Sequence, residues 1–144
     1  MKNNEQSVNE VRAAMDAWNA ALKEKDLGTM FKDYADRYRL FDVGSTANSI
    51  EETKTLWEQC FPYFDKPEIE YKNMVIEATD DMAVVHFNSR LNGISVEMPC
   101  EMAKAWLRGT VCFRKIDGVW KCIHEHCSFP VNCETNQINF EAAA

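Results

Sequence analysis

The run CIHEHC at positions 122–127 is the part of the sequence whose residue types and spacing most suggest chemistry. Alternate side chains of a strand share a face, so Cys122, His124 and His126 would stand together. Thiolate and imidazole ligands at such spacings are typical of zinc sites. However, Arg108 is predicted to lie opposite His126, where its positive charge would repel a cation. We therefore expect no metal, and expect these histidines to form hydrogen bonds instead.

The register of the last hairpin decides which side chains share a face. A three-residue loop at 116–118, with Gly118 in the left-handed position, would place Gly109 opposite Glu125 and Thr110 opposite His124. One face would then carry Leu107, Gly109, Val111, Phe113, Ile123, Glu125 and Cys127. The other would carry Trp106, Arg108, Thr110, Cys112, Cys122, His124, His126 and Ser128. A bulge in either strand would reverse part of this assignment.

Glu125 is the most informative residue of this hairpin, because it would be a carboxylate on an otherwise apolar face. Burial raises the pKa of a carboxyl group, which suits general acid or base catalysis. Alternatively, Glu125 forms a buried structural ion pair with Arg90 or His86. The strand that bears His86, Asn88 and Arg90 offers further polar side chains, and His86 is also interpretable as a hydrogen-bonded structural residue.

The elements that position these residues divide the chain into two halves. Apolar residues at spacings of three and four between Val8 and Leu22 predict a helix, and a shorter helix follows around 27–34. A strand is expected at 38–43, and Ser49 with Glu52 forms a capping box for a third helix that ends near Cys60. Alternating patterns then predict antiparallel strands near 69–76, 82–91, 103–115 and 119–128, with turns at 79–81 and 92–93. Helices followed by a meander indicate an α+β domain.

Composition excludes several classes of protein. The 144 residues suit one domain, and 46% are hydrophobic, which argues against disorder. A formal charge of −7 disfavours nucleic-acid binding. The N-terminal residues show no signal-peptide core and no segment is long enough to span a bilayer, so we expect a cytoplasmic protein without a membrane partner. Its six cysteines would then be thiols.

The segments RGTVCFRK at 108–115, DGVW at 117–120 and HEHCSFP at 124–130 carry a resemblance to a known family. They resemble the SnoaL-like, ketosteroid-isomerase-like branch of the nuclear transport factor 2 (NTF2)-like superfamily. They are also similar to the association (hub) domain of calcium/calmodulin-dependent protein kinase II. The resemblance implies a single SnoaL-like domain over 1–144. It would be a cone-shaped, cystatin-like α+β roll in which three N-terminal helices close a curved antiparallel sheet around a pocket.

The resemblance also implies where a site would lie. The apolar face of the hairpin would line the pocket, while Trp106, Arg108, Thr110, His124 and His126 would face a second subunit in a homodimer. Asp42 resembles the general base of ketosteroid isomerases, although it also suits a turn-capping role before Gly44. The isomerase's oxyanion-hole positions correspond here to Trp18 and Gly109, so steroid isomerisation is not expected.

Ligand contacts are implied at further positions. The arginine of the hub-domain pocket corresponds to Asn88 or Arg90, and its other arginines correspond to Val111 and Cys127, so its ligand preference does not transfer. The aromatic residues of the helical half are either core or pocket wall; these are Trp18, Tyr34, Trp57 and Phe61.

Two functions remain open from the sequence. The first is a small-molecule pocket protein, an isomerase, cyclase or lyase that abstracts a proton with Asp42 or Glu125, while His86 or Arg90 orients a carbonyl or carboxylate. The second is a non-catalytic oligomerisation module similar to the kinase hub. The ligand is an unidentified small molecule, and no cofactor is indicated.

Overall fold

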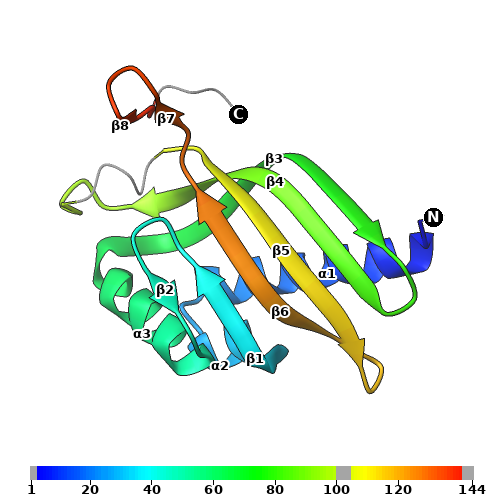
Figure 1. Ribbon diagram of the computed structural model, residues 1–144. Helices are drawn as coiled ribbons and strands as arrows, with labels where there is room; N and C mark the ends of the chain where they lie inside the picture. The colour runs from blue at the N-terminus through cyan, green and yellow to red at the C-terminus, as the bar shows by residue number, and fades with distance from the viewer. Residues whose placement is uncertain (1–2, 100–104, 141–144) are drawn as a thin grey trace.

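The computed structural model describes residues 3–99 and 105–140 and confirms an α+β fold with N-terminal helices and a curved, largely antiparallel sheet (Figure 1). Helix α1 (Glu5–Lys23) begins at Asn4, whose side chain accepts a hydrogen bond from the amide of Ser7. Helix α2 (Leu27–Phe31) is capped in the same way by Asp26. Both caps satisfy amides that would otherwise lack partners at a helix start.

Helix α3 (Ile50–Cys60) begins at the predicted capping box. The Ser49 hydroxyl accepts from the amide of Glu52 at 3.1 Å. The Glu52 carboxylate reaches back to the amide of Asn48 at 2.6 Å, one residue before the cap. A short 3-10 turn, η1 (Phe61–Tyr63), contains Pro62 and ends the helical half.

The main sheet has six strands in the order β2-β1-β6-β5-β4-β3. Its strands are β1 (Tyr34–Phe41), β2 (Thr46–Ala47), β3 (Phe64–Ala78), β4 (Met82–Ile94), β5 (Leu107–Ile116) and β6 (Val119–Ser128). Neighbouring strands are antiparallel, except that β1 runs parallel to β6. A separate hairpin pairs β7 (Val131–Asn132) with β8 (Gln137–Ile138).

Several predicted boundaries are wrong. Strand β1 starts at Tyr34, which the apolar pattern assigned to the second helix. Asn92 and Gly93 do not form a turn but continue β4, where Gly93 has a φ of +82° and a side chain would collide with the carbonyl of Asp65. The turn at 79–81 is confirmed. Residues 103 and 104 of the predicted fifth strand lie outside the described part of the chain.

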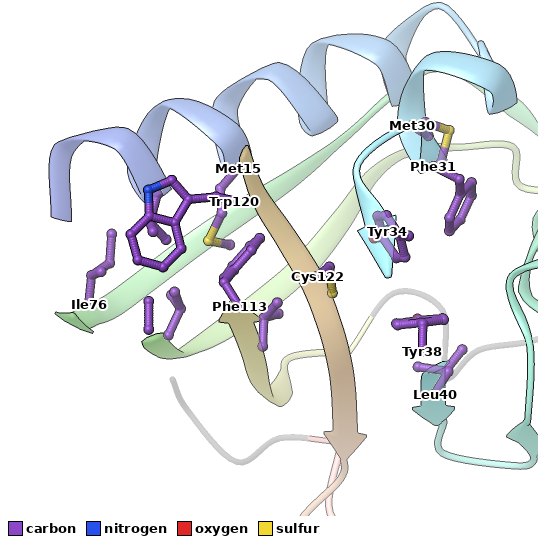
Figure 2. Close-up of a cluster of buried hydrophobic side chains, with 14 of the residues drawn as sticks. Met15, Met30, Phe31, Tyr34, Tyr38, Leu40, Ile76, Phe113, Trp120 and Cys122 are labelled. Carbon is purple, nitrogen blue, oxygen red and sulfur yellow. The ribbon is translucent and has the colours of Figure 1, made fainter. Parts of the chain in front are cut away.

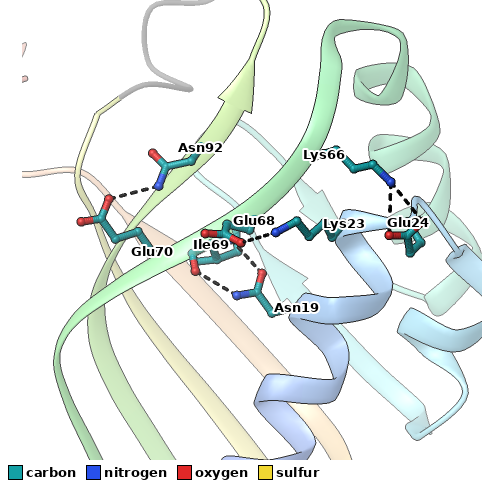
Figure 3. Close-up of polar contacts among 8 residues, drawn as sticks. All are labelled: Asn19, Lys23, Glu24, Lys66, Glu68, Ile69, Glu70 and Asn92. Carbon is teal, nitrogen blue, oxygen red and sulfur yellow. Dashed lines mark hydrogen bonds and ion pairs between the residues drawn. The ribbon is translucent and has the colours of Figure 1, made fainter.

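The hydrophobic core lies between α1 and the concave face of the sheet (Figure 2). Val11 and Leu22 of α1 are fully buried, as are Tyr38 of β1 and Val85 of β4. Hydrogen bonds also hold α1 on the sheet. The Asn19 side chain binds both the amide and the carbonyl of Ile69 on β3, at 2.8 and 2.9 Å, and Lys23 pairs with Glu68 nearby (Figure 3). The helix therefore covers one face of the sheet at a fixed register.

Candidate functional site

A cavity of about 420 Å³ lies between the helices and the concave face of the sheet. Its wall is largely apolar and comes from the three helices, from β1 and from strands β3–β6. Trp18, Leu56, Trp57, Ile69, Phe87, Leu91, Val111 and Phe113 are among the lining residues. A volume and wall of this kind suit a compact small molecule.

Strands β5 and β6 of the last hairpin pair in a register different from the one predicted. Its turn contains two residues, Asp117 and Gly118, both with positive φ, and Ile116 pairs with Val119. This shifts the register by one residue, and a bulge between Cys122 and His124 shifts it again. Together they shift the pairing by two residues, which restores the predicted faces beyond the bulge, so Glu125 faces the cavity as alternation predicts.

The altered register changes the face of the side chains before the bulge and the pairing partners of those after it. Cys122, predicted on the outer face, lines the cavity together with Trp120. Glu125 lies opposite Val111 rather than Gly109, which pairs with Cys127. The space above Gly109 is occupied by the ring of Phe87, which a Cβ atom at position 109 would approach to 2.4 Å. Gly109 therefore makes room for an aromatic wall rather than for a ligand above Glu125.

Glu125 is held by two tyrosine hydroxyl groups. Tyr34 donates to Oε1 at 2.6 Å and Tyr38 donates to Oε2 at 3.2 Å, and the thiol of Cys122 lies 3.6 Å from Oε1. The predicted alternative, an ion pair with Arg90 or His86, is not formed. The carboxyl group is thus oriented by neutral donors on β1 and β6 rather than neutralised by a cation.

Burial dominates the electrostatics of this group. Removal from water raises the pKa of Glu125, and the hydrogen bonds from Tyr34, Tyr38 and Cys122 offset only part of that effect. Burial and the adjacent carboxylate raise the pKa of Tyr34 and Tyr38, so both remain neutral donors. Glu125 is therefore a carboxyl group that can exchange a proton nearer to neutral pH than an exposed glutamate.

Two cysteines of the cavity wall, Cys122 and Cys127, are protonated thiols. Burial, followed by the charges of Glu125 and Asp42, raises the pKa of Cys127 to about 12. Burial also raises the pKa of Cys122. A nucleophilic cysteine needs a lowered pKa, so these residues do not suit covalent catalysis.

Asp42 lies at an exposed part of the cavity wall, just after the end of β1. Its side chain accepts a hydrogen bond from the amide of Val43 at 2.9 Å, which is a local turn contact. Leu40 and Asp42 are two residues apart, so their side chains point to the same face, and Leu40 pairs with Glu125. The cavity wall therefore has one carboxyl group deep inside, that of Glu125, and two at exposed positions, those of Asp33 and Asp42.

The structure brings most of the predicted aromatic and apolar positions together. Trp18, Tyr34, Trp57, Val111 and Cys127 line the cavity. Phe61 does not; it lies in η1 and packs against Trp57, with ring centroids 6.4 Å apart. 

Trp18 contributes an apolar wall to the cavity. Its indole N–H is buried and has no hydrogen-bond partner in the described part of the chain. The ring of Trp57 stands edge-on to it at 5.5 Å.

His86, Asn88 and Arg90 do not contact the cavity. Residues 85, 87, 89 and 91 of β4 face inward, so the intervening side chains point to the outer face of the sheet. Arg90 pairs with Glu70 at 2.9 Å and lies 4.7 Å from the ring of Trp106. Their assignment to the ligand pocket is therefore corrected.

The residues predicted to face a second subunit do lie on the outer face. Arg108, Thr110 and His126 line one groove, and His124 packs edge-on against Phe41 at 4.8 Å. Trp106 lies beside the cations Lys72 and Arg90. The homodimer itself stays a prediction.

Sequence reasoning missed Tyr38, the second donor to Glu125. Alternation with Leu40 and Asp42 would have placed it on the cavity face, but nothing in the sequence indicates the shift in the β1–β6 pairing between Tyr34 and Arg39. Over residues 3–99 and 105–140, no group of three or more His, Cys, Asp or Glu side chains could hold a metal ion. Within the same ranges, no helix is both long enough and apolar enough to cross a membrane.

A curved sheet closed by helices around one cavity is the architecture of NTF2-like proteins. The SnoaL-like domain model matches residues 11–132, so the chain belongs to the SnoaL-like domain family. No curated protein sequence matches the chain.

Solved structures agree on the fold. An NTF2-like protein of unknown function from Pseudomonas putida is 24% identical, with a TM-score of 0.83 over 99% of this chain and 100% of the other. A candidate dehydratase of the NTF2-like family from Streptomyces avermitilis is 16% identical, with a TM-score of 0.71 over 90% and 99% of the two chains. A candidate ketosteroid isomerase from Shewanella frigidimarina is 21% identical, with a TM-score of 0.64 over 81% and 92%.

Proposed function

We propose that this protein binds a compact, largely apolar small molecule in its cavity and that Glu125 exchanges a proton with it, as in an isomerase, cyclase or lyase. The observation that carries the proposal is a carboxyl group of raised pKa on the wall of an apolar cavity. A carboxyl group costs free energy in such surroundings, and proton transfer is the chemistry for which that cost is useful.

The shape and polarity of the cavity support this substrate class. About 420 Å³ admits a molecule of small-metabolite size, and the walls offer aromatic and aliphatic surface. Glu125 is the polar group at the centre of the wall formed by β6, so a ligand would place a hydroxyl group or an acidic C–H bond there. A polyanionic ligand would be repelled by this carboxylate.

The hydrogen bonds around Glu125 support a role in proton transfer. Two neutral hydroxyl donors fix the carboxyl plane without supplying a positive charge that would make the carboxylate a weak base. Ionised, Glu125 can accept a proton from a carbon next to a carbonyl group; protonated, it can return that proton to another atom. Asp42, the exposed carboxylate on the same cavity wall, offers a second proton acceptor.

The named neighbours are compatible with this reaction class. Dehydration and ketosteroid isomerisation both begin with a proton transfer, and the two candidate enzymes share the fold. Identities of 16% and 21% transfer no substrate, and Gly109 offers no side-chain donor for an oxyanion. The proposal therefore names proton transfer and leaves steroids out.

The test is hydrogen–deuterium exchange into small cyclic ketones. Wild-type protein in D₂O should exchange the hydrogens next to the carbonyl faster than buffer does, as followed by proton NMR. Glu125→Gln should lower the enzymatic rate by about 100-fold or more, which is the usual contribution of a general base.

A matched control uses the same substitution at Glu51, an exposed residue of α3, which should leave the rate unchanged. Asp42→Asn shows whether the second carboxylate contributes. An exchange rate in Glu125→Gln equal to that of wild type would refute the role of Glu125. Absence of exchange by the wild-type protein across the panel would favour the non-catalytic alternative.

A further inference from the structure

Some hydroxyl groups of the cavity wall have no hydrogen-bond partner. Of the hydroxyl-bearing side chains that line the cavity, Thr29 and Tyr34 each donate to a carboxylate at 2.6 Å. The hydroxyl groups of Tyr71 and Ser89 form no hydrogen bond within the part of the chain that the structure describes. A hydroxyl group withdrawn from bulk water costs free energy until it is paired, so these two groups mark polar contacts for a ligand.

Tyr71 and Ser89 stand side by side on the concave face of the sheet. They are direct partners across β3 and β4, so their side chains leave the sheet from neighbouring positions on the same face. Ser89 is only 5% exposed, which leaves its side chain little to meet besides a molecule in the cavity. The wall is therefore polar at this place, although most of it is apolar.

The ring of Tyr71 is oriented by an aromatic contact. It packs edge-on against the ring of Phe87, with centroids 4.8 Å apart and an angle of 78° between the planes. The Phe87 ring in turn occupies the space above Gly109 on β5, and Gly109 pairs with Cys127, two residues from Glu125 on β6. The side chain of Tyr71 therefore leans from β3 toward the strand that carries Glu125.

The electrostatics agree with this direction. Burial raises the pKa of Tyr71, and the charge of Glu125 is the next cause of the shift. The side chain nevertheless keeps part of its surface exposed, as expected of a residue that borders a cavity rather than bulk water. Its hydroxyl group thus stays a neutral hydrogen-bond donor within reach of the Glu125 charge.

We propose that Tyr71 binds the carbonyl oxygen of the ligand while Glu125 faces the carbon next to that carbonyl group. The inference rests on the proton transfer proposed above and adds the class of ligand, a compact apolar ketone. Such a molecule would lie on the apolar surface of Phe87 and Val111, and Val111 is the residue opposite Glu125. Its oxygen would point toward β3 and its acidic C–H bond toward β6.

The two residues would divide one reaction between them. Ionised Glu125 takes a proton from the carbon next to the carbonyl group, the electron pair of that C–H bond forms a C=C bond, and the π pair of the carbonyl group moves to the oxygen. Negative charge therefore develops on the oxygen that Tyr71 binds, where a donor already in place stabilises it. Return of a proton from Glu125 to carbon regenerates the ketone.

The test compares acetophenone with α-methylstyrene, the hydrocarbon in which a CH₂ group replaces the carbonyl oxygen, by NMR titration of ¹⁵N-labelled full-length protein. Tyr71→Phe removes only the hydroxyl group and should weaken acetophenone binding by about threefold to tenfold, the effect of losing one hydrogen bond. It should change the affinity for α-methylstyrene less than twofold. Tyr63→Phe is the matched control, because Tyr63 of η1 is not among the described residues that line the cavity, and it should change neither affinity.

An infrared measurement keeps the test decisive if Tyr71→Phe disturbs the fold. The carbonyl stretch of acetophenone bound to the wild-type protein should lie at a lower frequency than in hexane, because the oxygen accepts a hydrogen bond. A stretch equal to that in hexane, or no saturable binding of acetophenone, would overturn the proposal. Equal effects of Tyr71→Phe on both ligands would overturn it as well.

These measurements report binding, so they separate this inference from the proposed reaction. A loss confined to acetophenone in Tyr71→Phe, together with no deuterium exchange by the wild-type protein, would support the Tyr71 contact and refute the proton transfer. Deuterium exchange by a protein in which Tyr71→Phe leaves acetophenone binding unchanged would support the proton transfer and refute the Tyr71 contact.

Discussion

The hydrogen bond between Tyr34 and Glu125 gives the sharpest test of how the cavity is built. Tyr34→Phe removes one hydroxyl and keeps the ring that packs on Phe31 and Tyr38, with centroids 4.6 and 4.7 Å away. The lost bond is 2.6 Å long and partly buried. Hydrogen bonds to charged groups contribute about 1.5–3 kcal/mol, so we expect a loss of about 2 kcal/mol when Glu125 is ionised. For a domain of this size that lowers Tm by roughly 4–8 °C.

The assay is a double-mutant cycle by urea denaturation at about pH 8, where carboxyl groups are largely ionised. In a Glu125→Leu background the hydroxyl of Tyr34 has no carboxylate to bind, so Tyr34→Phe should cost less than about 0.5 kcal/mol there. Tyr38→Phe should show weaker coupling, because its bond to Glu125 is 3.2 Å long. Equal losses from Tyr34→Phe in both backgrounds would refute the proposed coupling.

Three further predictions concern stability. Burial raises the pKa of Glu125 above its unfolded value, so the wild-type protein loses stability as the pH rises through the folded pKa. The free energy of unfolding of Glu125→Gln should therefore rise relative to that of wild type between about pH 4.5 and pH 8. Urea denaturation at both ends of this interval measures the difference. A difference that shrinks over this interval would contradict the raised pKa. Gly109→Ala should cost about 1–3 kcal/mol because its Cβ would meet the Phe87 ring, whereas Gly44→Ala, with no atom within 4 Å, should be tolerated in the same thermal melts. Asn19→Ala should cost about 1–3 kcal/mol and speed amide exchange in β3, since it removes both side-chain bonds to that strand; unchanged exchange would show that the helix is held otherwise.

The fold was predictable because its signals are local and repeated. The capping residue Ser49, the helical spacing from Val8 to Leu22 and the alternation in β4 to β6 each indicate an element without reference to the others. The prediction failed at Tyr34, where an apolar residue suits either a helix or a strand and only tertiary pairing decides.

The site was less predictable because it depends on register. Strand alternation predicts the face of Glu125, but a two-residue turn and the bulge after Cys122 each shift the pairing by one residue, and only beyond the bulge does the total shift of two residues restore the predicted faces. On β4 the sequence pattern predicts the polar residues as pocket residues, whereas their inward neighbours Phe87 and Ser89 form the wall of the cavity. Shifting a strand by one residue exchanges its two faces. When both faces are partly exposed, the sequence of the strand does not show which of them lines the cavity.

The most direct test of the central claim is a ¹³C NMR titration of the glutamate side-chain carboxyl groups, with the Glu125 signal assigned by its loss in Glu125→Gln. The account predicts that this carboxyl group titrates at a higher pH than the exposed glutamates of the same protein, and that an apolar ketone which enters the cavity moves its midpoint. Titration of Glu125 together with the exposed glutamates, or at a lower pH, would contradict the claim that an apolar cavity tunes this residue for proton transfer.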